Sequence, residues 1–247
     1  MKITEHKKTF IKKHWYKPLF NKGDFLFVHG FNSTWYNHAA FLEKMFKKGY
    51  NIFTFDLPNH GLNFDYPAQI TFGEYCNFVK DFISKNNLKK IIIAGHSMGG
   101  GIVAALQNDN NLKFKDVILI DPLQKGATSD IIKRVVSTIF VNGFGKVNEW
   151  FDKTNSNPSL EHFKLLKNIT SKDTLIEIEN GMRNINQPVQ LIFGESDDII
   201  PVQPSLEIIK SHIKVLTISI IKNAKHSPTI QNTDDTFDEV IKFLKRI

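Results

Sequence analysis

A serine flanked by glycines is the strongest chemical signal in this chain. The motif Gly95-His96-Ser97-Met98-Gly99 follows an apolar, β-branched block at 90–94 and precedes small and apolar residues at 100–106. These neighbours predict a strand, a sharp turn and a helix, a context that exposes the serine hydroxyl on a strained backbone. The first N–H groups of such a helix lie at its positive end and suit a developing oxyanion. The motif therefore predicts that Ser97 is a nucleophile that attacks a carbonyl group.

A histidine near the C-terminal end is the candidate base. A neutral serine hydroxyl is a poor nucleophile, so it needs a base within hydrogen-bond distance. The chain has nine histidines, and only His226 follows the last strand-like block, at 215–221. We expect His226 to take the hydroxyl proton during attack and to return it to the leaving group. We expect His29 to lie in the turn after an earlier strand, and His96 to point away from Ser97.

Three aspartates are candidates for the acid that completes a triad. Asp197 and Asp198 follow the strand-like block at 188–193, and Asp121 follows an earlier block. An acid in this role fixes the tautomer of the histidine and stabilises the imidazolium that forms. The spacing Gly-x-x-Asp-x-x-x-Pro, which runs from 194 to 201, favours Asp197. Asp198 and Asp121 remain the alternatives.

The order of these residues along the chain, serine then acid then histidine, is the order found in α/β-hydrolases. On these residues the chain resembles the α/β-hydrolase fold superfamily, in its lipase- and esterase-like branch. The resemblance extends from about residue 25 to the C-terminal end and rests on the following stretches: His29-Gly30-Phe31, Asp56 to Gly61, Gly95 to Gly100, Gly194 to Pro201, and Lys225-His226-Ser227. One departure is Lys225, at a position where members usually carry a small residue.

The resemblance implies an oxyanion hole and an acyl pocket. The hole consists of the backbone N–H groups of Phe31 and Met98, and His29 belongs to the same turn as Phe31. Each such donor typically contributes about 2.7–4 kcal/mol to the transition state. The expected pocket is apolar and is lined by these side chains: Phe31, Met98, Phe140, Phe144 and Trp150.

Strand-like and helix-like segments alternate along the chain, which predicts the α/β fold class. Apolar blocks predict strands at 25–28, 51–57, 90–94, 117–120, 188–193 and 215–221, and apolar residues at helical spacing predict helices at 38–48, 71–86 and 233–246. This alternation favours a mostly parallel central sheet with helices on both faces. One or two edge strands within 2–22 precede the sheet, and Thr233 is the expected N-cap of the closing helix.

The alternation breaks between residue 123 and about residue 186. Several helix-like patterns fill this stretch, and family members commonly carry a helical insertion here. We expect a small helical cap or lid over the carboxyl edge of the sheet, where sheets of this type bind ligands. The expected organisation is a hydrolase core at 1–122 and 187–247 with the cap at 123–186.

The composition excludes several classes of protein. A length of 247 residues fits one α/β domain, and the single cysteine excludes an intrachain disulfide. Cys76 lies on an apolar helical stripe and is expected in the core. No apolar run approaches the roughly 20 residues that span a bilayer, and the polar N-terminal segment lacks the apolar core of a signal peptide. The expected location is the cytoplasm.

The net charge of +7 comes from lysines that are scattered in pairs. This scatter predicts no nucleic-acid partner and leaves open only a weak association with an anionic membrane surface. The chain lacks the histidine spacing and the cysteine pairs of metal sites, so no metal is expected. It also lacks a glycine-rich phosphate loop, and we expect Gly99-Gly100-Gly101 to serve close packing of helix on strand. No cofactor is expected.

The function predicted from the sequence is that of a serine hydrolase. Its substrate is a small carboxylic ester with an apolar acyl or aryl group, such as a short- or medium-chain acyl ester or a monoacylglycerol. The same triad serves thioesterases, acyltransferases, C–C bond hydrolases and aminopeptidases, which remain alternatives. A ligand-sensing protein with little turnover is the alternative outside catalysis.

Overall fold

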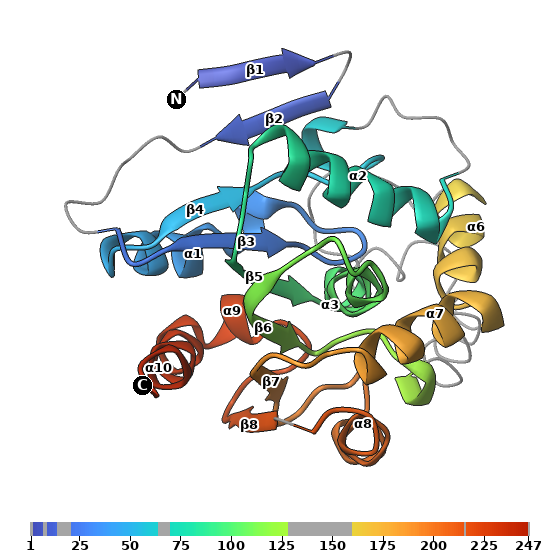
Figure 1. Cartoon of the computed structure of the whole chain (residues 1–247). Coiled ribbons are helices and arrows are strands. Elements are labelled where there is room, and N and C mark those ends of the chain that lie inside the picture. The colour runs from blue at the N-terminus through green and yellow to red at the C-terminus, as the bar shows by residue number, and fades with distance from the viewer. Residues whose placement is uncertain are drawn as a thin grey trace.

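The computed structural model describes residues 2–6, 9–13, 21–63, 70–127, 160–214 and 216–246. These residues fold around an eight-stranded sheet (Figure 1). The strand order is β1-β2-β4-β3-β5-β6-β7-β8. The strands are β1 (Lys2–His6), β2 (Thr9–Lys13), β3 (Asp24–Val28), β4 (Asn51–Thr54), β5 (Ile91–His96), β6 (Phe114–Ile120), β7 (Val189–Gly194) and β8 (Leu216–Ile221). The six strands β3 to β8 are parallel to one another. The expected edge strands are β1 and β2; β1 pairs antiparallel with β2, and β2 pairs antiparallel with β4. The predicted fold class is confirmed.

Helices cover both faces of this sheet. They are α1 (Ala39–Lys47), α2 (Phe72–Lys85), α3 (Met98–Ala105), α6 (Leu160–Ile169), α7 (Lys172–Arg183), α8 (Val202–Lys210), α9 (Pro228–Gln231) and α10 (Thr233–Leu244). Four 3-10 turns are also described: η1 (Trp35–His38), η2 (Gly61–Asn63), η3 (Leu106–Asn108) and η4 (Lys125–Ala127). Figure 1 shows α1 and α10 on one side of the sheet and α2, α3 and α8 on the other.

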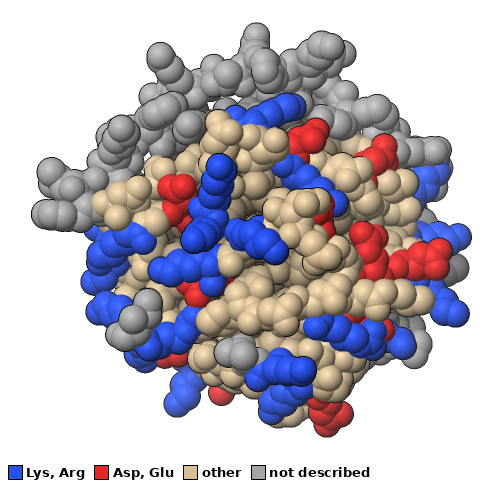
Figure 2. Space-filling model, in the orientation of Figure 1, with Lys and Arg blue, Asp and Glu red and all other residues tan. Residues whose placement is uncertain are grey.

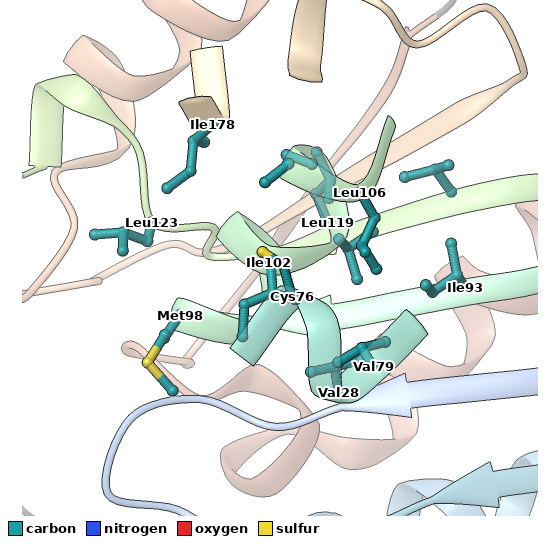
Figure 3. Packing of buried hydrophobic residues seen from close by; sticks show 14 of the residues in the cluster. Val28, Cys76, Val79, Ile93, Met98, Ile102, Leu106, Leu119, Leu123 and Ile178 are labelled. Atoms are coloured by element: carbon teal, nitrogen blue, oxygen red, sulfur yellow. The ribbon is translucent and has the colours of Figure 1, made fainter. Parts of the chain in front are cut away.

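Alternate residues of each central strand feed two separate hydrophobic clusters. In β3, Phe25 and Phe27 pack with α1 and α10, whereas Leu26 and Val28 pack with α2 and α3. The side chains of a strand alternate between faces, so a strand covered on both sides must be apolar at every position. Figure 3 shows part of the second cluster, in which Cys76 of α2 lies near Ile102 of α3. Burial raises the pKa of the Cys76 thiol to about 12, and its place in the core is confirmed.

The glycines that follow Ser97 let α3 lie very close to the sheet. A Cβ atom on Gly99 would lie 2.3 Å from the carbonyl oxygen of Val28, at the end of β3. A Cβ atom on Gly100 would lie 2.8 Å from the Cβ of Pro122, just after β6. Real side chains do not fit at such distances, so the predicted packing role of these glycines is confirmed. Because of this approach, the first turn of α3 lies at the carboxyl ends of β3 and β6.

Several expected element boundaries differ from the structure by one to three residues, and two of these differences have a clear local reason. The strand at β4 ends at Thr54 and not at residue 57, although Phe55 and Leu57 are completely buried. These two residues are buried although they lie outside the hydrogen-bonded strand, so the sequence has the same apolar pattern as a longer strand. The N-cap of α10 is Asn232, and not Thr233, because the Asn232 side chain accepts the N–H of Asp235.

The structure describes the predicted cap region only at 123–127 and 160–186. Helix α7 packs against α3: Ile178 is buried in the same cluster, and a Cβ atom on Gly181 would lie 2.0 Å from the carbonyl oxygen of Ala104. This helix therefore packs on α3, within the helical layer on one side of the sheet. Residues 128–159, which include Phe140, Phe144 and Trp150, lie outside the described residues. The division of the chain into a core and a cap at 123–186 stays a prediction.

Charged side chains are interspersed on the surface. Figure 2 shows basic side chains spread over one face of the molecule, with acidic side chains between them. Several of the acidic groups pair with a basic neighbour, as in the contact of Lys80 with Asp109 at 3.1 Å. Within the described part of the chain, no helix has both the length and the apolar character that crossing a membrane requires.

Candidate active site

Ser97 lies in the tight turn between β5 and α3. Its φ of 54° and ψ of −119° are unusual for a residue other than glycine, and such strain costs on the order of 1–3 kcal/mol. Three hydrogen bonds hold the turn: the Ser97 N–H donates to Ile120 O at 2.9 Å, and its carbonyl accepts the N–H groups of Gly101 at 3.1 Å and Leu123 at 2.9 Å. These partners belong to α3 and to the end of β6, so the surrounding structure imposes the strained geometry.

His226 and Asp197 form a hydrogen-bonded chain with Ser97. His226 Nδ1 lies 2.9 Å from Asp197 Oδ2, and His226 Nε2 lies 2.9 Å from Ser97 Oγ. An ionised carboxylate can only accept, so Nδ1 carries the proton and Nε2 accepts from the serine hydroxyl. The three side chains come from the β5–α3 turn, the loop after β7 and the loop after β8. The structure thus brings together the serine, histidine and aspartate that the sequence singled out.

The carboxylate of Asp197 is buried and surrounded by donors. Its Oδ1 accepts the N–H groups of Ile199 at 2.8 Å and Ile200 at 2.9 Å. Burial by itself raises the pKa of Asp197, but the hydrogen bond and the charge interaction with His226, with the other donors, bring this pKa below its ordinary value. Asp197 is therefore ionised at neutral pH and can stabilise a positive charge on the imidazole.

The neighbouring Asp198 faces outward. Its Oδ2 lies 3.8 Å from the Nζ atom of Lys225, and both side chains are more than half exposed. Lys225, which departs from the small residue expected there, thus directs its ammonium group away from the site. Its backbone is packed more tightly, since a Cβ atom on Gly194 would lie 1.8 Å from the Lys225 carbonyl oxygen. Of the two adjacent aspartates, the structure places Asp197 beside His226.

The third candidate acid, Asp121, lies behind Asp197 at the end of β6. It is completely buried, and its Oδ1 accepts the N–H of Gly194 at 3.1 Å. Burial, and then the charge of Asp197, raise the pKa of Asp121 well above its ordinary value. One ligand atom each from Asp121, Asp197 and His226 lie within 4.8 Å of one another, the one such group among the described residues. The His226–Asp197 hydrogen bond already accounts for two members of this group.

His96 supports the main chain of His226, a role that the sequence did not reveal. Its Nε2–H donates to the His226 carbonyl at 2.6 Å, and the two rings lie 5.1 Å apart. Burial, and then the nearby His226, lower the pKa of His96 to about 3, so its ring is neutral. Buried His38 lies behind it and contacts Thr229 Oγ1 at 2.8 Å. A histidine inside the serine motif was the available signal, because a buried ring next to the nucleophile needs a partner.

His29 orients the peptide that is expected at the oxyanion hole. The Leu57 N–H donates to His29 Nε2 at 2.8 Å, which leaves Nδ1–H to donate to Gly30 O at 2.8 Å. Burial lowers the pKa of His29 to about 4, so this neutral tautomer persists at neutral pH. The C=O and N–H of a trans peptide point in opposite directions, so the Phe31 N–H points away from His29. Gly30 lies against Ser97, since a Cβ atom on it would lie 2.9 Å from Ser97 Cβ.

Met98 is the second expected oxyanion donor, and it is the first residue of α3. The first N–H groups of a helix have no acceptor within the helix. The side chain of Met98 is buried in the core cluster, as Figure 3 shows, and Phe31 packs against the same cluster. Of the predicted pocket residues, Met98 directly follows Ser97 and Phe31 directly follows Gly30, which lies against Ser97, whereas the other three fall outside the described residues.

Comparison with known proteins agrees with this architecture. Residues 25–172 match the family model described as "alpha/beta hydrolase fold". The chain therefore belongs to the alpha/beta hydrolase fold family. It is 25% identical to "Putative esterase/lipase 2" of Mycoplasma pneumoniae, a match that covers 94% of this chain and 92% of that protein. It is 26% identical to "Putative esterase/lipase 2" of Mycoplasma genitalium, over 99% of this chain and 98% of that one.

Solved structures share the same fold at lower sequence identity. An esterase from Exiguobacterium antarcticum superimposes with a TM-score of 0.71 at 16% identity, and the match covers 92% of this chain and 93% of that chain. A bacterial membrane phospholipase A has a TM-score of 0.68 at 21% identity, over 90% of this chain and 78% of that chain. These two likenesses concern the fold.

Proposed function

We propose that this chain is a serine hydrolase that cleaves carboxylic esters through an acyl-enzyme intermediate. The observation that carries the proposal is the continuous hydrogen-bonded chain from Asp197 through His226 to Ser97, with both links at 2.9 Å. Relatives that are named as esterases or lipases over more than nine-tenths of the chain support the same reaction class. Our proposal assigns the nucleophile to Ser97, the base to His226 and the acid to Asp197.

The first half-reaction acylates the serine. As Ser97 Oγ attacks the ester carbonyl, its proton moves to His226 Nε2, and the carbonyl oxygen becomes an oxyanion. The N–H groups of Phe31 and Met98 donate to this oxyanion. The ionised Asp197 stabilises the imidazolium through Nδ1–H. When the tetrahedral intermediate collapses, His226 gives the proton to the departing alcohol oxygen, and the acyl group remains on Ser97.

The second half-reaction releases the acid. A water molecule takes the place of the alcohol, and His226 Nε2 removes one of its protons as its oxygen attacks the acyl carbon. The same two N–H groups stabilise the second oxyanion. Collapse breaks the bond to Ser97 Oγ, which regains its proton from His226. The acid product leaves, and the free enzyme is restored.

The proposed substrate class is an ester with a short- or medium-length apolar acyl group, or a monoacylglycerol. Support comes from the apolar side chains of Phe31 and Met98 beside the nucleophile and from the esterase and lipase names of the relatives. Thioesters, acyl acceptors other than water, C–C bonds and aminoacyl amides are the competing substrates for the same three residues. A ligand sensor would bind an ester tightly and turn it over very slowly.

The test is the hydrolysis of p-nitrophenyl esters of increasing acyl length by the purified protein and by Ser97→Ala. We expect an optimum at one acyl length and a loss of about 10⁵- to 10⁶-fold in kcat for the variant. Ser84→Ala is the matched control, because this serine is exposed at the end of α2, which precedes β5, whereas Ser97 follows β5 at the other end of that strand. A fluorophosphonate should add one adduct to the wild type and none to Ser97→Ala.

Turnover that survives in Ser97→Ala would contradict the assignment of the nucleophile. Covalent labelling of Ser97 without turnover on any ester would keep the nucleophile and reject the ester as substrate. Turnover on thioesters that exceeds turnover on matched oxygen esters by tenfold or more would move the proposal to a thioesterase.

A further inference from the structure

Asp121 presents a buried oxygen with no donor to satisfy it. Its side chain is completely buried, and Oδ1 accepts the Gly194 N–H at 3.1 Å. If Asp121 is an ionised carboxylate, its oxygens can only accept hydrogen bonds. Its Oδ2 then has no hydrogen-bond partner among the described groups. A buried polar atom that stays unsatisfied is costly, and such exceptions need a physical explanation.

A second carboxyl group lies close to the Asp121 side chain. Oxygen atoms of Asp121 and Asp197 and a ring nitrogen of His226 all lie within 4.8 Å of one another. Two carboxyl groups that share a buried site cannot both be ionised without strong repulsion. One of them must hold a proton, and a protonated carboxyl group gains an O–H donor. That donor would satisfy the atom that is otherwise without a partner.

The surroundings decide which of the two carries the proton. Asp197 accepts from the N–H groups of Ile199 and Ile200 and from His226, so three donors stabilise its charge. Among the groups that the structure describes, Asp121 accepts from one backbone N–H only. Burial and the charge of Asp197 raise the pKa of Asp121 well above its ordinary value, whereas the pKa of Asp197 is lowered. Both comparisons place the proton on Asp121.

We propose that Asp121 is a positioning residue that stays a neutral carboxylic acid and donates its Oδ2–H to the carboxylate of Asp197. This inference rests on the function proposed above and adds a fourth member to the chain: Asp121, Asp197, His226 and Ser97. The hydrogen bond spreads the negative charge of Asp197 and fixes the orientation in which its Oδ2 meets the imidazole. The other oxygen of Asp121 fixes Gly194, where the loop that carries the histidine touches the loop that carries the acid.

Asparagine is the matched probe for this role. At position 121 its carbonyl can accept from Gly194 and its amide can donate to Asp197, so Asp121→Asn reproduces the neutral acid. It also tolerates the φ of 42° at this position, which most side chains disfavour. At position 197 the same change removes the charge that the mechanism requires. One chemical substitution on two adjacent carboxyl groups should therefore have opposite results.

The kinetic experiment compares these variants on the best p-nitrophenyl ester, with active sites counted by fluorophosphonate titration. We expect Asp121→Asn to keep kcat within about threefold of the wild type and Asp197→Asn to lose about 10⁴-fold. Asp121→Ala, which has no donor, should lose about tenfold or more in kcat with little change in KM. If Asp121→Asn is as impaired as Asp197→Asn, or no better than Asp121→Ala, the proposal is wrong.

The pH profile of Asp121→Ala gives a readout that a merely structural role would not change. The groups that face His226 are Asp197, Asp121 and the neutral His96, with the exposed Asp198–Lys225 pair at the surface. Without the donor, the negative charge of Asp197 is more concentrated and favours imidazolium. The acid limb of kcat/KM should move to higher pH in Asp121→Ala and stay in place in Asp121→Asn. An unmoved limb in Asp121→Ala would contradict the proposal.

Infrared spectroscopy tests the proton without any turnover. A buried neutral carboxylic acid has a carbonyl stretching band that an ionised carboxylate lacks. At neutral pH we expect such a band in the wild type and in Ser97→Ala, and its loss in Asp121→Asn. A wild-type spectrum without this band overturns the inference even if esters are hydrolysed. A band that depends on Asp121, in a protein that hydrolyses no ester, supports the inference and counts against the proposed function only.

Discussion

Several polar residues at the carboxyl ends of the central strands, here called the carboxyl edge, are buried, whereas several at the amino ends, the amino edge, are exposed. At the carboxyl edge, His29 and Asp121 are completely buried, and each is hydrogen-bonded to the backbone. At the amino edge, the turns before β5 and β6 carry Lys89, Lys90 and Lys113, all exposed. The register of β5 on β6, which pairs residue 91 with residue 114, brings these lysines to the same edge.

Strained backbone is present at both edges and therefore does not by itself mark the site. Ser97 and Asp121 have positive φ at the carboxyl edge, and Asn87 and Lys90 have positive φ at the amino edge. The difference lies in what surrounds them. A buried polar side chain that is hydrogen-bonded to another strand cannot move or be replaced without leaving its partner unsatisfied. An exposed lysine side chain is solvated in any rotamer. The comparison teaches that long-range, buried hydrogen bonds distinguish the functional edge, and the following predictions test it.

Among the variants that test this comparison, the largest effect on stability is expected where the backbone of α3 meets the strand ends. In Gly99→Ala the new Cβ would lie 2.3 Å from Val28 O and 2.5 Å from His29 O. Backbone atoms cannot yield as side chains do, so we expect a loss of about 3 kcal/mol or more in unfolding free energy. The displaced turn should also lower kcat by at least about 100-fold. Urea unfolding and ester hydrolysis measure the two effects.

Gly73→Ala is the control for this clash, because a Cβ atom at that position of α2 would meet nothing within 4 Å. It should leave kcat unchanged and raise the unfolding free energy by up to about 1 kcal/mol. Equal behaviour of the two alanine variants would remove the distinction between the crowded edge and the rest of the fold.

The next effect concerns the orientation of the Gly30–Phe31 peptide. His29→Gln can still accept from Leu57 but loses the donor to Gly30 O, whereas His29→Asn keeps that donor. We expect His29→Gln to lower kcat by about 10- to 100-fold with KM nearly unchanged, since an oxyanion donor acts in the transition state. His29→Asn should retain most of the rate. Equal losses in both variants would show that the Gly30 hydrogen bond does not matter.

A smaller effect is the pH dependence of stability. The unfolded chain takes up a proton on histidine near pH 6.5, whereas the pKa values of buried His29 and His96 are about 4 and about 3. Between these pH values the unfolded state binds more protons than the folded state. The contribution of these histidines to the unfolding free energy is therefore fully present above pH 6.5 and is lost as the pH is lowered. Each histidine contributes up to about 1.4 kcal/mol per pH unit in this window.

Urea unfolding at pH 7, 6 and 5 checks this slope in the wild type and in His96→Gln. The variant should have the shallower dependence, because one of the buried rings no longer resists protonation. A constant unfolding free energy from pH 7 to pH 5, or identical slopes in the two proteins, would contradict the assignment of His96 as a buried neutral ring.

The smallest effect is expected at the amino edge. Lys89→Gln and Lys113→Gln remove exposed charges that are remote from the serine. We expect changes within about 0.5 kcal/mol in unfolding free energy and within about twofold in kcat/KM. A tenfold loss of activity in either variant would show that the amino edge takes part in function. It would contradict the proposed difference between the two edges.

The sequence predicted the parts of this protein that depend on local pattern. Continuous apolar blocks such as 25–28 predicted strands buried on both faces, and the structure gives them one cluster on each side. The serine motif predicted the turn between β5 and α3. The apolar pattern at 51–57 misled, because Phe55 and Leu57 are buried outside the ladder, and the N-cap of α10 was misplaced by one residue.

The sequence predicted the types of residue in the candidate site, but it did not decide which of the candidate aspartates is buried or which long-range contacts form. Asp121, Asp197 and Asp198 are equally acidic in sequence, and only the packing of β6 beside β7 shows that the first two have buried carboxyl groups close together while the third is exposed. The contact of His96 with the backbone of His226 joins residues that are 130 positions apart. No local pattern encodes such a contact.

By itself, then, the sequence determined the fold class, the position of the candidate nucleophile and the order of its candidate partners, because periodicity and turn chemistry act between near neighbours in the chain. The tertiary structure alone decided which aspartate meets His226, which way the Gly30–Phe31 peptide points and which carboxyl group is left without a donor. Those outcomes depend on distances between the ends of different strands. In a buried site, such distances decide which groups are charged, which are neutral and which can react.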